Sequence, residues 1–145
     1  MEIYTIGFTK KSAAEFFETL KRAGIKRLID IRLNNQSQLA GFTKQDDLNY
    51  FLKELGGIEY VHDLRLAPTQ EIIGEYRQKK ITWDEYESRF INLLKERKID
   101  KILKKKFFSV PSVLLCSEPE PDHCHRRLVA EFFSRFWNNV SIIHL

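Results

Sequence analysis

Five short apolar runs alternate with segments of helical period along this chain, and this alternation constrains the fold more than any other feature. The runs indicate strands near residues 2–6, 26–32, 58–61, 112–116 and 140–143. Between them lie residues whose apolar side chains recur every three or four positions, as on one face of a helix. Strands that alternate with helices form a mostly parallel sheet with helices on both faces. The sequence therefore predicts an α/β fold of about five strands, Rossmann-like in class.

The length and composition agree with one compact domain spanning residues 1–145. A domain of 145 residues buries about two-thirds of the surface of its unfolded chain, so it needs neither a disulfide nor a metal to hold a core. With 43% hydrophobic residues the chain does not belong to the disordered class. It contains no repeat, low-complexity stretch or linker. Its sequence does not indicate whether the protein is a monomer or an oligomer.

The first residues and the cysteine content bear on the compartment. The chain opens directly into a predicted strand rather than a signal peptide, and no apolar run approaches the length of a membrane span. Two cysteines do not make a disulfide framework of the kind found in small secreted domains. A cytoplasmic location without a membrane partner is therefore expected.

Several helix starts can be read from local sequence. Residues Ser12 to Glu15 and Thr82 to Glu85 match the capping box, in which a hydroxyl and a carboxylate cap the first turn reciprocally. Thr43 with Asp46 predicts the start of another helix, and Asp122 is the predicted N-cap of the last one.

Residues 113–127 hold most of the chemistry. They contain both cysteines, a polar turn from Cys116 to Glu118, and the predicted first turn of the last helix, with Cys124 to Arg126. Free backbone N–H groups and the helix dipole at such a turn favour anions and lower the pKa of a thiol. Arg126 and Arg127 place two positive charges at this positive helix end, which is unfavourable unless a negatively charged group compensates them. Carboxylates of the turn and an external anionic ligand are both candidates.

Asp30 and Arg32 interrupt the apolar run of the second predicted strand. A charged side chain inside a buried strand is costly unless it is paired. We therefore expect at least one of the two to be buried and hydrogen-bonded to the loop after the first or the fourth strand. The carboxyl ends of parallel strands also carry ligands. A structural ion pair and a ligand-binding role are both open, and one pair could serve both.

The loops after the first, second and fourth strands are expected to share one edge of the sheet, because the carboxyl ends of parallel strands lie together. This edge defines a crevice for a ligand. Its candidate catalytic residues are Asp30, Cys116, Glu118 and Cys124, and its candidate ligand-binding residues are Gly7, Thr9, Arg32, Ser37, His62, His125 and Arg126. A lone histidine after a strand, such as His62, is more often a hydrogen-bonding residue of the loop than a catalyst.

Taken in order, several of these motifs resemble the domain of unknown function 488 family. The resemblance covers nearly the whole chain and implies a compact α/β domain, but it supplies no established activity. The sequence differs from the family pattern in one place. Many members carry a proline after the Asp-x-Arg motif, whereas Asn34 and Asn35 occupy that region here. The matching segments are Thr5-Ile6-Gly7, Asp30-Ile31-Arg32, the loop from Ser37 to Phe42, Tyr60-Val61-His62, Cys116-Ser117-Glu118 and Cys124-His125-Arg126.

The chemistry of the crevice predicts a protein that binds or acts on an anionic, phosphate-containing ligand, such as a nucleotide or a nucleic acid. Arg32, Arg126 and the helix N-terminus would hold the anion. If the protein is an enzyme, it is expected to be a hydrolase or transferase. Either Glu118 or Asp30 would then be the general acid or base, or Cys124 the nucleophile. The sequence requires no cofactor.

Three other functions stay open. The net charge of +4 and the lysine-rich segment 98–106 fit a non-enzymatic nucleic-acid-binding module, although Phe107 and Phe108 are expected in the core rather than free for base stacking. Cys116 and Cys124 could pair reversibly as a redox site, because a strand end and the next helix start lie close together. The cysteines and a histidine could bind a metal, but their seven-residue spacer is not a zinc-finger spacing, so no metal ligands are assigned.

Overall fold

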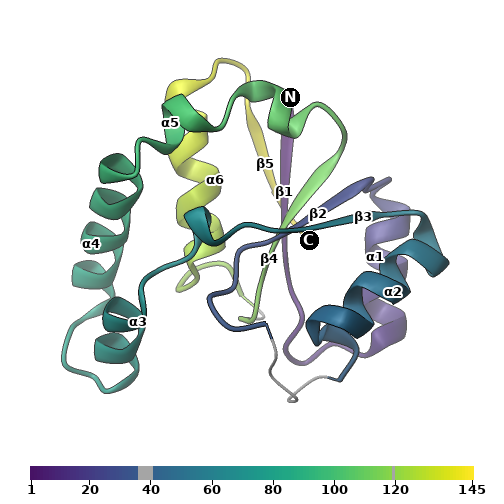
Figure 1. The fold of residues 1–145 in the computed structure, drawn as a ribbon, viewed down its shortest axis with the longest axis horizontal. Coiled ribbons are helices and arrows are strands. Elements are labelled where there is room, and N and C mark those ends of the chain that lie inside the picture. The colour runs from purple at the N-terminus through teal and green to yellow at the C-terminus, as the bar shows by residue number, and fades with distance from the viewer. Residues whose placement is uncertain (36–40, 119) are drawn as a thin grey trace.

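The sheet has five parallel strands, and its strand order places β4 at the centre. A computed structural model describes residues 1–35, 41–118 and 120–145. The strands pair in the order β3-β2-β4-β1-β5 (Figure 1), and every pairing is parallel. The predicted α/β class with a parallel sheet is confirmed, and every strand end lies within two residues of its expected position. The strands are β1 (Glu2–Gly7), β2 (Arg27–Asp30), β3 (Glu59–His62), β4 (Ser112–Cys116) and β5 (Ser141–His144).

Helices cover both faces of the sheet (Figure 1). One face packs against α1 (Ala13–Arg22) and α2 (Gln45–Gly56), and the other against α4 (Trp83–Glu96) and α6 (His125–Phe136), with α3 (Gln70–Arg77) and α5 (Ile99–Ile102) beside them. The buried side chains of β4 alternate between these faces. Val113 and Leu115 join the core under α1 and α2, whereas Leu114 joins the core under α4 and α6. None of the helices in the described part of the chain combines the length and the apolar character needed to cross a bilayer.

The hydroxyl half of each predicted capping box is confirmed, while the carboxylates of Glu15 and Glu85 accept from the capping hydroxyls. The hydroxyl oxygens of Ser12 and Thr82 accept hydrogen bonds from the backbone N–H groups of Glu15 and Glu85, at the starts of α1 and α4. Each cap satisfies one of the backbone donors that the first turn of a helix leaves unpaired. These two helix starts are therefore determined by local sequence.

The start of α2 differs from the prediction. This helix begins at Gln45 after Lys44, and no side chain caps it. Thr43 lies instead in a 3-10 turn, η1 (Gly41–Thr43), where it is buried. Its carbonyl oxygen accepts a hydrogen bond from Arg32, so a long-range contact holds Thr43 outside the helix.

The start of α6 also differs, because Cys124 rather than Asp122 is the N-cap. The backbone N–H of Cys124 donates to the carbonyl of Pro121 and closes a turn there. The helix consequently begins at His125. The expectation that Cys124, His125 and Arg126 lie at the helix start is nevertheless confirmed.

The lysine-rich segment 98–106 is not one helix. It is divided between α5 and a 3-10 turn, η3 (Lys105–Phe108), because the backbone at Leu103 is extended. Its lysines are exposed, while Phe107 packs against the core and Phe108 is buried in it, as predicted. Since η3 precedes β4, the segment lies at the amino ends of the strands, opposite the carboxyl ends where the candidate residues gather (Figure 1).

Candidate functional site

The carboxyl ends of β1, β2 and β4 meet at one edge of the sheet, as predicted. Gly7 at the end of β1 is in register with Cys116 at the end of β4, and Asp30 at the end of β2 lies beside the same strand. The start of α6 reaches this edge too, because His125 donates a hydrogen bond to the carbonyl of Ile31. Candidate residues from four segments far apart in the sequence are therefore neighbours.

Gly7 and Thr9 hold the loop after β1 against the turn after β4. The backbone N–H of Thr9 donates to the carbonyl of Ser117 over 3.1 Å. A Cβ atom on Gly7 would lie 1.7 Å from the carbonyl oxygen of Glu118, so a larger residue fits only if that backbone moves. The contacts of both residues thus brace one loop against the other.

Arg126 reinforces the same turn. Its side chain is fully buried, its Nη1 donates to the carbonyl oxygen of Glu118, and its Nε donates to a hydroxyl of β1. Burial lowers the pKa of this guanidinium to about 10, so it stays positively charged at neutral pH. Arg127 pairs with the carboxylates of Glu87 and Glu131. Both cations therefore have partners within the protein. Arg127 pairs with carboxylates, and the partners of Arg126 include a backbone carbonyl and a hydroxyl.

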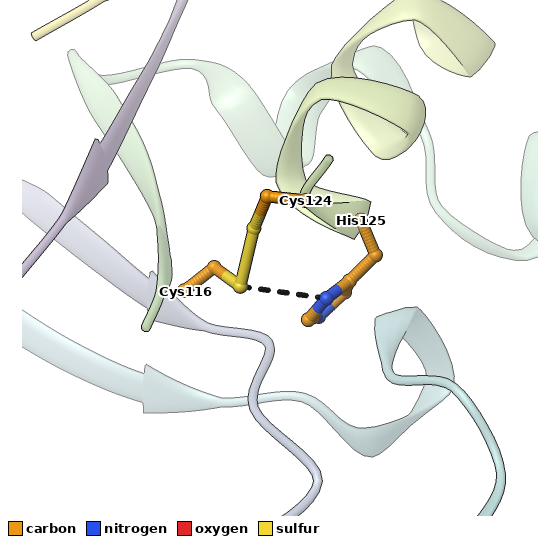
Figure 2. A group of neighbouring side chains, drawn as sticks. All are labelled: Cys116, Cys124 and His125. Atoms are coloured by element: carbon orange, nitrogen blue, oxygen red, sulfur yellow. Dashed lines mark hydrogen bonds between the residues drawn. A yellow bond between two sulfur atoms is a disulfide. The ribbon is translucent and has the colours of Figure 1, made fainter. Parts of the chain in front are cut away.

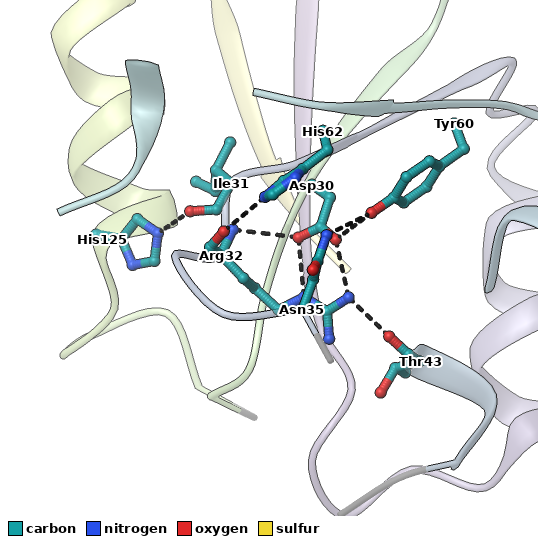
Figure 3. Close-up of polar contacts among 8 residues, drawn as sticks. All are labelled: Asp30, Ile31, Arg32, Asn35, Thr43, Tyr60, His62 and His125. Atoms are coloured by element: carbon teal, nitrogen blue, oxygen red, sulfur yellow. Dashed lines mark hydrogen bonds and ion pairs between the residues drawn. The ribbon is translucent and has the colours of Figure 1, made fainter. Parts of the chain in front are cut away.

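Asp30 and Arg32 form a buried ion pair (Figure 3). The Nε and Nη2 atoms of Arg32 donate to the two carboxylate oxygens of Asp30, each over 2.8 Å, and Asp30 also accepts the backbone N–H of Arg32. Asp30 and Arg32 are 0% and 3% exposed, so the predicted burial is confirmed. A bidentate pair of this kind is among the strongest charge-assisted contacts in proteins.

The hydrogen-bond partners predicted for this pair were wrong. The observed hydrogen-bond partners come from β3 and η1 rather than from the loops after β1 and β4. The hydroxyl of Tyr60 donates to Asp30 over 2.6 Å, and Arg32 donates to the carbonyl of Thr43 over 2.7 Å. Burial and the charge of Asp30 raise the pKa of Tyr60. The loop after β1 contributes the ring of Phe8, whose centroid lies 5.3 Å from the guanidinium.

His62 and Ser37 complete the set named from the sequence. The Nε2 of His62 donates to the carbonyl of Arg32 over 2.9 Å (Figure 3), so this histidine holds the loop after β2, as expected of a lone histidine after a strand. Ser37 lies outside the described residues.

Cys116, Cys124 and His125 form a buried cluster at the start of α6 (Figure 2). The two sulfur atoms are joined as a disulfide, so the pairing considered from the sequence is present. The Nδ1 of His125 lies 3.4 Å from the sulfur of Cys116, and its Nε2 donates to the carbonyl of Ile31 over 2.7 Å. That hydrogen bond places the ring proton on Nε2, so the lone pair of Nδ1 faces the sulfur.

Burial keeps the imidazole of His125 neutral. It lowers the pKa of this ring to about 4, and the charge of Arg126 acts in the same direction. The hydrogen bond to Ile31 and the charge of Asp30 act in the opposite direction but are outweighed. At neutral pH, Nδ1 is therefore an unprotonated acceptor beside the Cys116 sulfur.

The buried His125 predicts that the oxidised protein loses stability in mild acid. The folded ring has a pKa of about 4, below the ordinary 6.5 that it regains on unfolding. Between these pH values the unfolded chain binds more protons than the folded protein. The neutral ring therefore contributes up to about 3 kcal/mol to the free energy of unfolding above pH 6.5, and this contribution is lost as the pH falls towards 4. Urea unfolding at several pH values measures it. A His125→Gln variant should lose this part of the slope, and an unchanged slope would contradict the assignment.

A pocket of about 250 Å³ opens beside the cluster. The side of the pocket formed by the turn after β4 and the start of α6 carries both cysteines and Glu118. Another part of the lining is aromatic, because the rings of Trp83 and Tyr86 stack with centroids 4.9 Å apart and His123 stacks on Trp83 at 5.0 Å. Both cysteines therefore line a cavity large enough for a small molecule, although each is almost fully buried.

The residues named from the sequence fall into two groups. Those that line the pocket are Arg32, Cys116, Glu118, Cys124 and His125. The second group supports the surrounding loops and is not part of the pocket lining among the described residues: Gly7, Thr9, Asp30, His62 and Arg126. Sequence reasoning missed the wall from α3, α4 and the turn before α6, which includes Tyr76, Arg77, Trp83, Tyr86 and His123. The capping box at Thr82 identified a helix start at Trp83 but carried no sign that this helix faces the sheet edge.

One family model matches the chain, over residues 12–133, and it is described as "Domain of unknown function DUF488". The match covers most of the chain and includes both cysteines and the pocket walls from α3, α4 and α6. No curated protein matches, and no solved structure matches.

Proposed function

We propose that this chain, which belongs to the DUF488 family, is a thiol–disulfide redox protein whose reactive pair is Cys116 and Cys124. One observation carries the proposal: two paired cysteines, buried but both lining a pocket, have an unprotonated imidazole nitrogen 3.4 Å from one of their sulfur atoms. A pair that served only to hold the fold would need neither the pocket nor the base.

The two cysteines have different surroundings, and these suggest different roles. Cys124 is the N-cap of α6, where the helix dipole and the free backbone N–H groups favour a thiolate. Cys116 ends a buried strand, and its acceptor is Nδ1 of His125. We assign Cys124 as the attacking thiolate and Cys116 as the resolving thiol.

The reaction balances as an exchange with a disulfide of the form RSSR. The Cys124 thiolate attacks one sulfur of RSSR, which releases one RS⁻ and leaves a mixed disulfide on Cys124. Cys116, whose sulfur lies beside Nδ1 of His125, attacks the Cys124 sulfur and breaks its bond to the second RS group. The proton of Cys116 passes to this departing RS⁻, which leaves as RSH. The substrate gains two electrons and the protein forms its internal disulfide. A cellular dithiol would reverse the reaction and restore the thiols.

The sequence predicted an anionic ligand, and we keep this prediction only for an anionic group carried by the disulfide substrate. Arg32 and Arg126 were named to hold it, and both guanidinium groups have internal partners. Arg32 also lines the pocket, and its buried Nη1 has no hydrogen-bond partner among the described residues. Arg77 is exposed on the pocket wall, so it is a second cation placed to contact an anionic group on a substrate. Comparing an anionic with a neutral disulfide on an Arg77→Gln variant tests this part, since only the anionic substrate should react more slowly.

Reaction with dithiobis(nitrobenzoate), an anionic aromatic disulfide, tests the proposal. The reduced folded protein should release two equivalents of thionitrobenzoate and retain none, because Cys116 resolves the mixed disulfide. Cys116→Ser should release one and retain one on Cys124, whereas Cys124→Ser should react more slowly by about 10-fold or more, since it lacks the helix-terminal thiolate. Release only after unfolding, or equal rates for the two variants, would contradict the proposal.

A further inference from the structure

We propose that the reduced protein binds a thiophilic divalent ion of the zinc class through the sulfurs of Cys116 and Cys124 and Nδ1 of His125, with the fourth coordination position open to the pocket. This inference rests on the proposed function in one respect, because both thiols must be free before they can ligate. It goes beyond it by assigning a second chemistry to the same residues, available only in the reduced state.

One pair of ligand atoms already has the spacing of a tetrahedral site, and the two sulfur atoms separate when their bond is reduced. The three ligand atoms lie within 4.8 Å of one another, and the sulfur of Cys116 lies 3.4 Å from Nδ1 of His125. Ordinary zinc–sulfur and zinc–nitrogen bond lengths place such a pair about 3.6 Å apart. The Cα atoms of the two cysteines are 7.2 Å apart, beyond the roughly 4.4–6.8 Å usual for disulfides. After reduction the backbone therefore leaves room for an ion between the side chains.

The surroundings of His125 favour ligation over protonation. Metal-binding histidines usually donate their second ring N–H to a carbonyl or carboxylate, which fixes the ring and directs the other nitrogen to the metal. The Nε2 of His125 donates in this way to the carbonyl of Ile31 over 2.7 Å (Figure 3). This partner holds the lone pair of Nδ1 on the cluster before any ion arrives.

The set of ligands resembles catalytic rather than structural zinc sites. Structural sites have four protein ligands, whereas catalytic sites have three and keep one position for water or substrate. Cys116, Cys124 and His125 are the grouped metal-binding side chains in the described part of the chain, and all three line the pocket. Glu118 lines the same pocket, so a carboxylate is available to hold a proton of a bound water.

The spacer between the cysteines does not oppose this site. From the sequence alone, seven intervening residues excluded a zinc finger, where both cysteines come from one tight turn. Here the first cysteine ends β4 and the second caps α6, and the two elements converge at one edge. The spacing is that of a strand–loop–helix connection rather than of a finger.

Cobalt(II), a spectroscopic probe for zinc, tests the inference on the reduced full-length chain. One equivalent should produce thiolate-to-cobalt charge-transfer absorption and the intense d–d bands of a tetrahedral ion, and zinc should remove both. Azide, entering the open position, should shift the d–d bands. The oxidised protein should give none of these signals. A weak octahedral spectrum would overturn the site, and d–d bands indifferent to azide would overturn its open position.

Variants identify the ligands. Cys124→Ser and His125→Gln should each weaken zinc binding by more than about 100-fold, the upper range for loss of a mere outer-shell partner. His123→Gln is the matched control, because it removes the histidine next to Cys124 that stacks on Trp83, and it should keep the affinity. If His125→Gln fails to fold, protection of the wild-type thiols from alkylation by one equivalent of zinc decides the question. Thiols that form but remain unprotected would overturn the metal site alone, whereas a native pair that cannot be reduced would overturn both proposals.

Discussion

Replacing Arg32 with Met is expected to lower the free energy of unfolding by about 3–5 kcal/mol, because the carboxylate of Asp30 is then left buried without its counter-charge. The pair is almost fully buried and bidentate. The hydroxyl of Tyr60 and the carbonyl of Thr43 add hydrogen bonds to it, so one substitution disturbs β2, β3 and η1 together. Asp30→Asn should cost a similar amount, measured by urea unfolding at neutral pH.

The chain contains a matched control for this prediction. Asp63 and Arg65 form the same motif two residues apart, with Nε and Nη2 of the arginine on the two carboxylate oxygens. Arg65 differs in being 48% exposed. Asp63 is itself only 5% exposed, but water can reach its carboxylate once the half-exposed arginine is removed, so Arg65→Met should cost less than Arg32→Met. Similar losses for Arg32→Met and Arg65→Met would show that burial does not determine the effect.

Gly7→Ala is expected to lower the free energy of unfolding by about 3 kcal/mol, at the upper end of overpacking effects. The new Cβ would lie 1.7 Å from the carbonyl oxygen of Glu118 and 2.8 Å from Nη1 of Arg126. Neither atom can move without loss of the hydrogen bond between them. The turn after Cys116 would shift, so disulfide exchange should slow as well. Urea unfolding and the exchange rate measure the two effects.

Gly41→Ala is the control for this substitution. A Cβ on Gly41 meets no atom of the described residues within 4 Å, so this change should stay within about 0.5 kcal/mol of the wild type. If Gly7→Ala behaves like Gly41→Ala, then the close approach of the two loops is not what requires glycine at the end of β1.

The elements of the fold could be predicted because their signals are local. A strand such as β4 is an apolar run, and the capping boxes at Ser12 and Thr82 lie within one helical turn. The burial of Asp30 and Arg32 followed from the cost of placing a charge inside an apolar strand. None of these inferences needed to know which strands are neighbours.

The partners in the site could not be predicted, because they depend on strand order and on how the helices fold back. Tyr60 reaches Asp30 because β3 lies beside β2, and nothing in the local sequence of either strand encodes that pairing. Trp83 and His123 form one wall although forty residues separate them. The contact of Arg126 with the carbonyl of Glu118 could not be predicted either, because a backbone group is a partner that no sequence motif reveals.

The central claim is that Cys116 and Cys124 form a reversible redox pair in the folded protein. Equilibration of the native chain in glutathione buffers of graded ratio, followed by acid quenching and counting of thiols by mass, tests it most directly. We predict a single two-electron transition from no free thiol to two, traced identically from the oxidised and the reduced side, with the far-ultraviolet circular dichroism unchanged. Two free thiols at every buffer ratio, or a disulfide that opens only when the protein unfolds, would contradict the account.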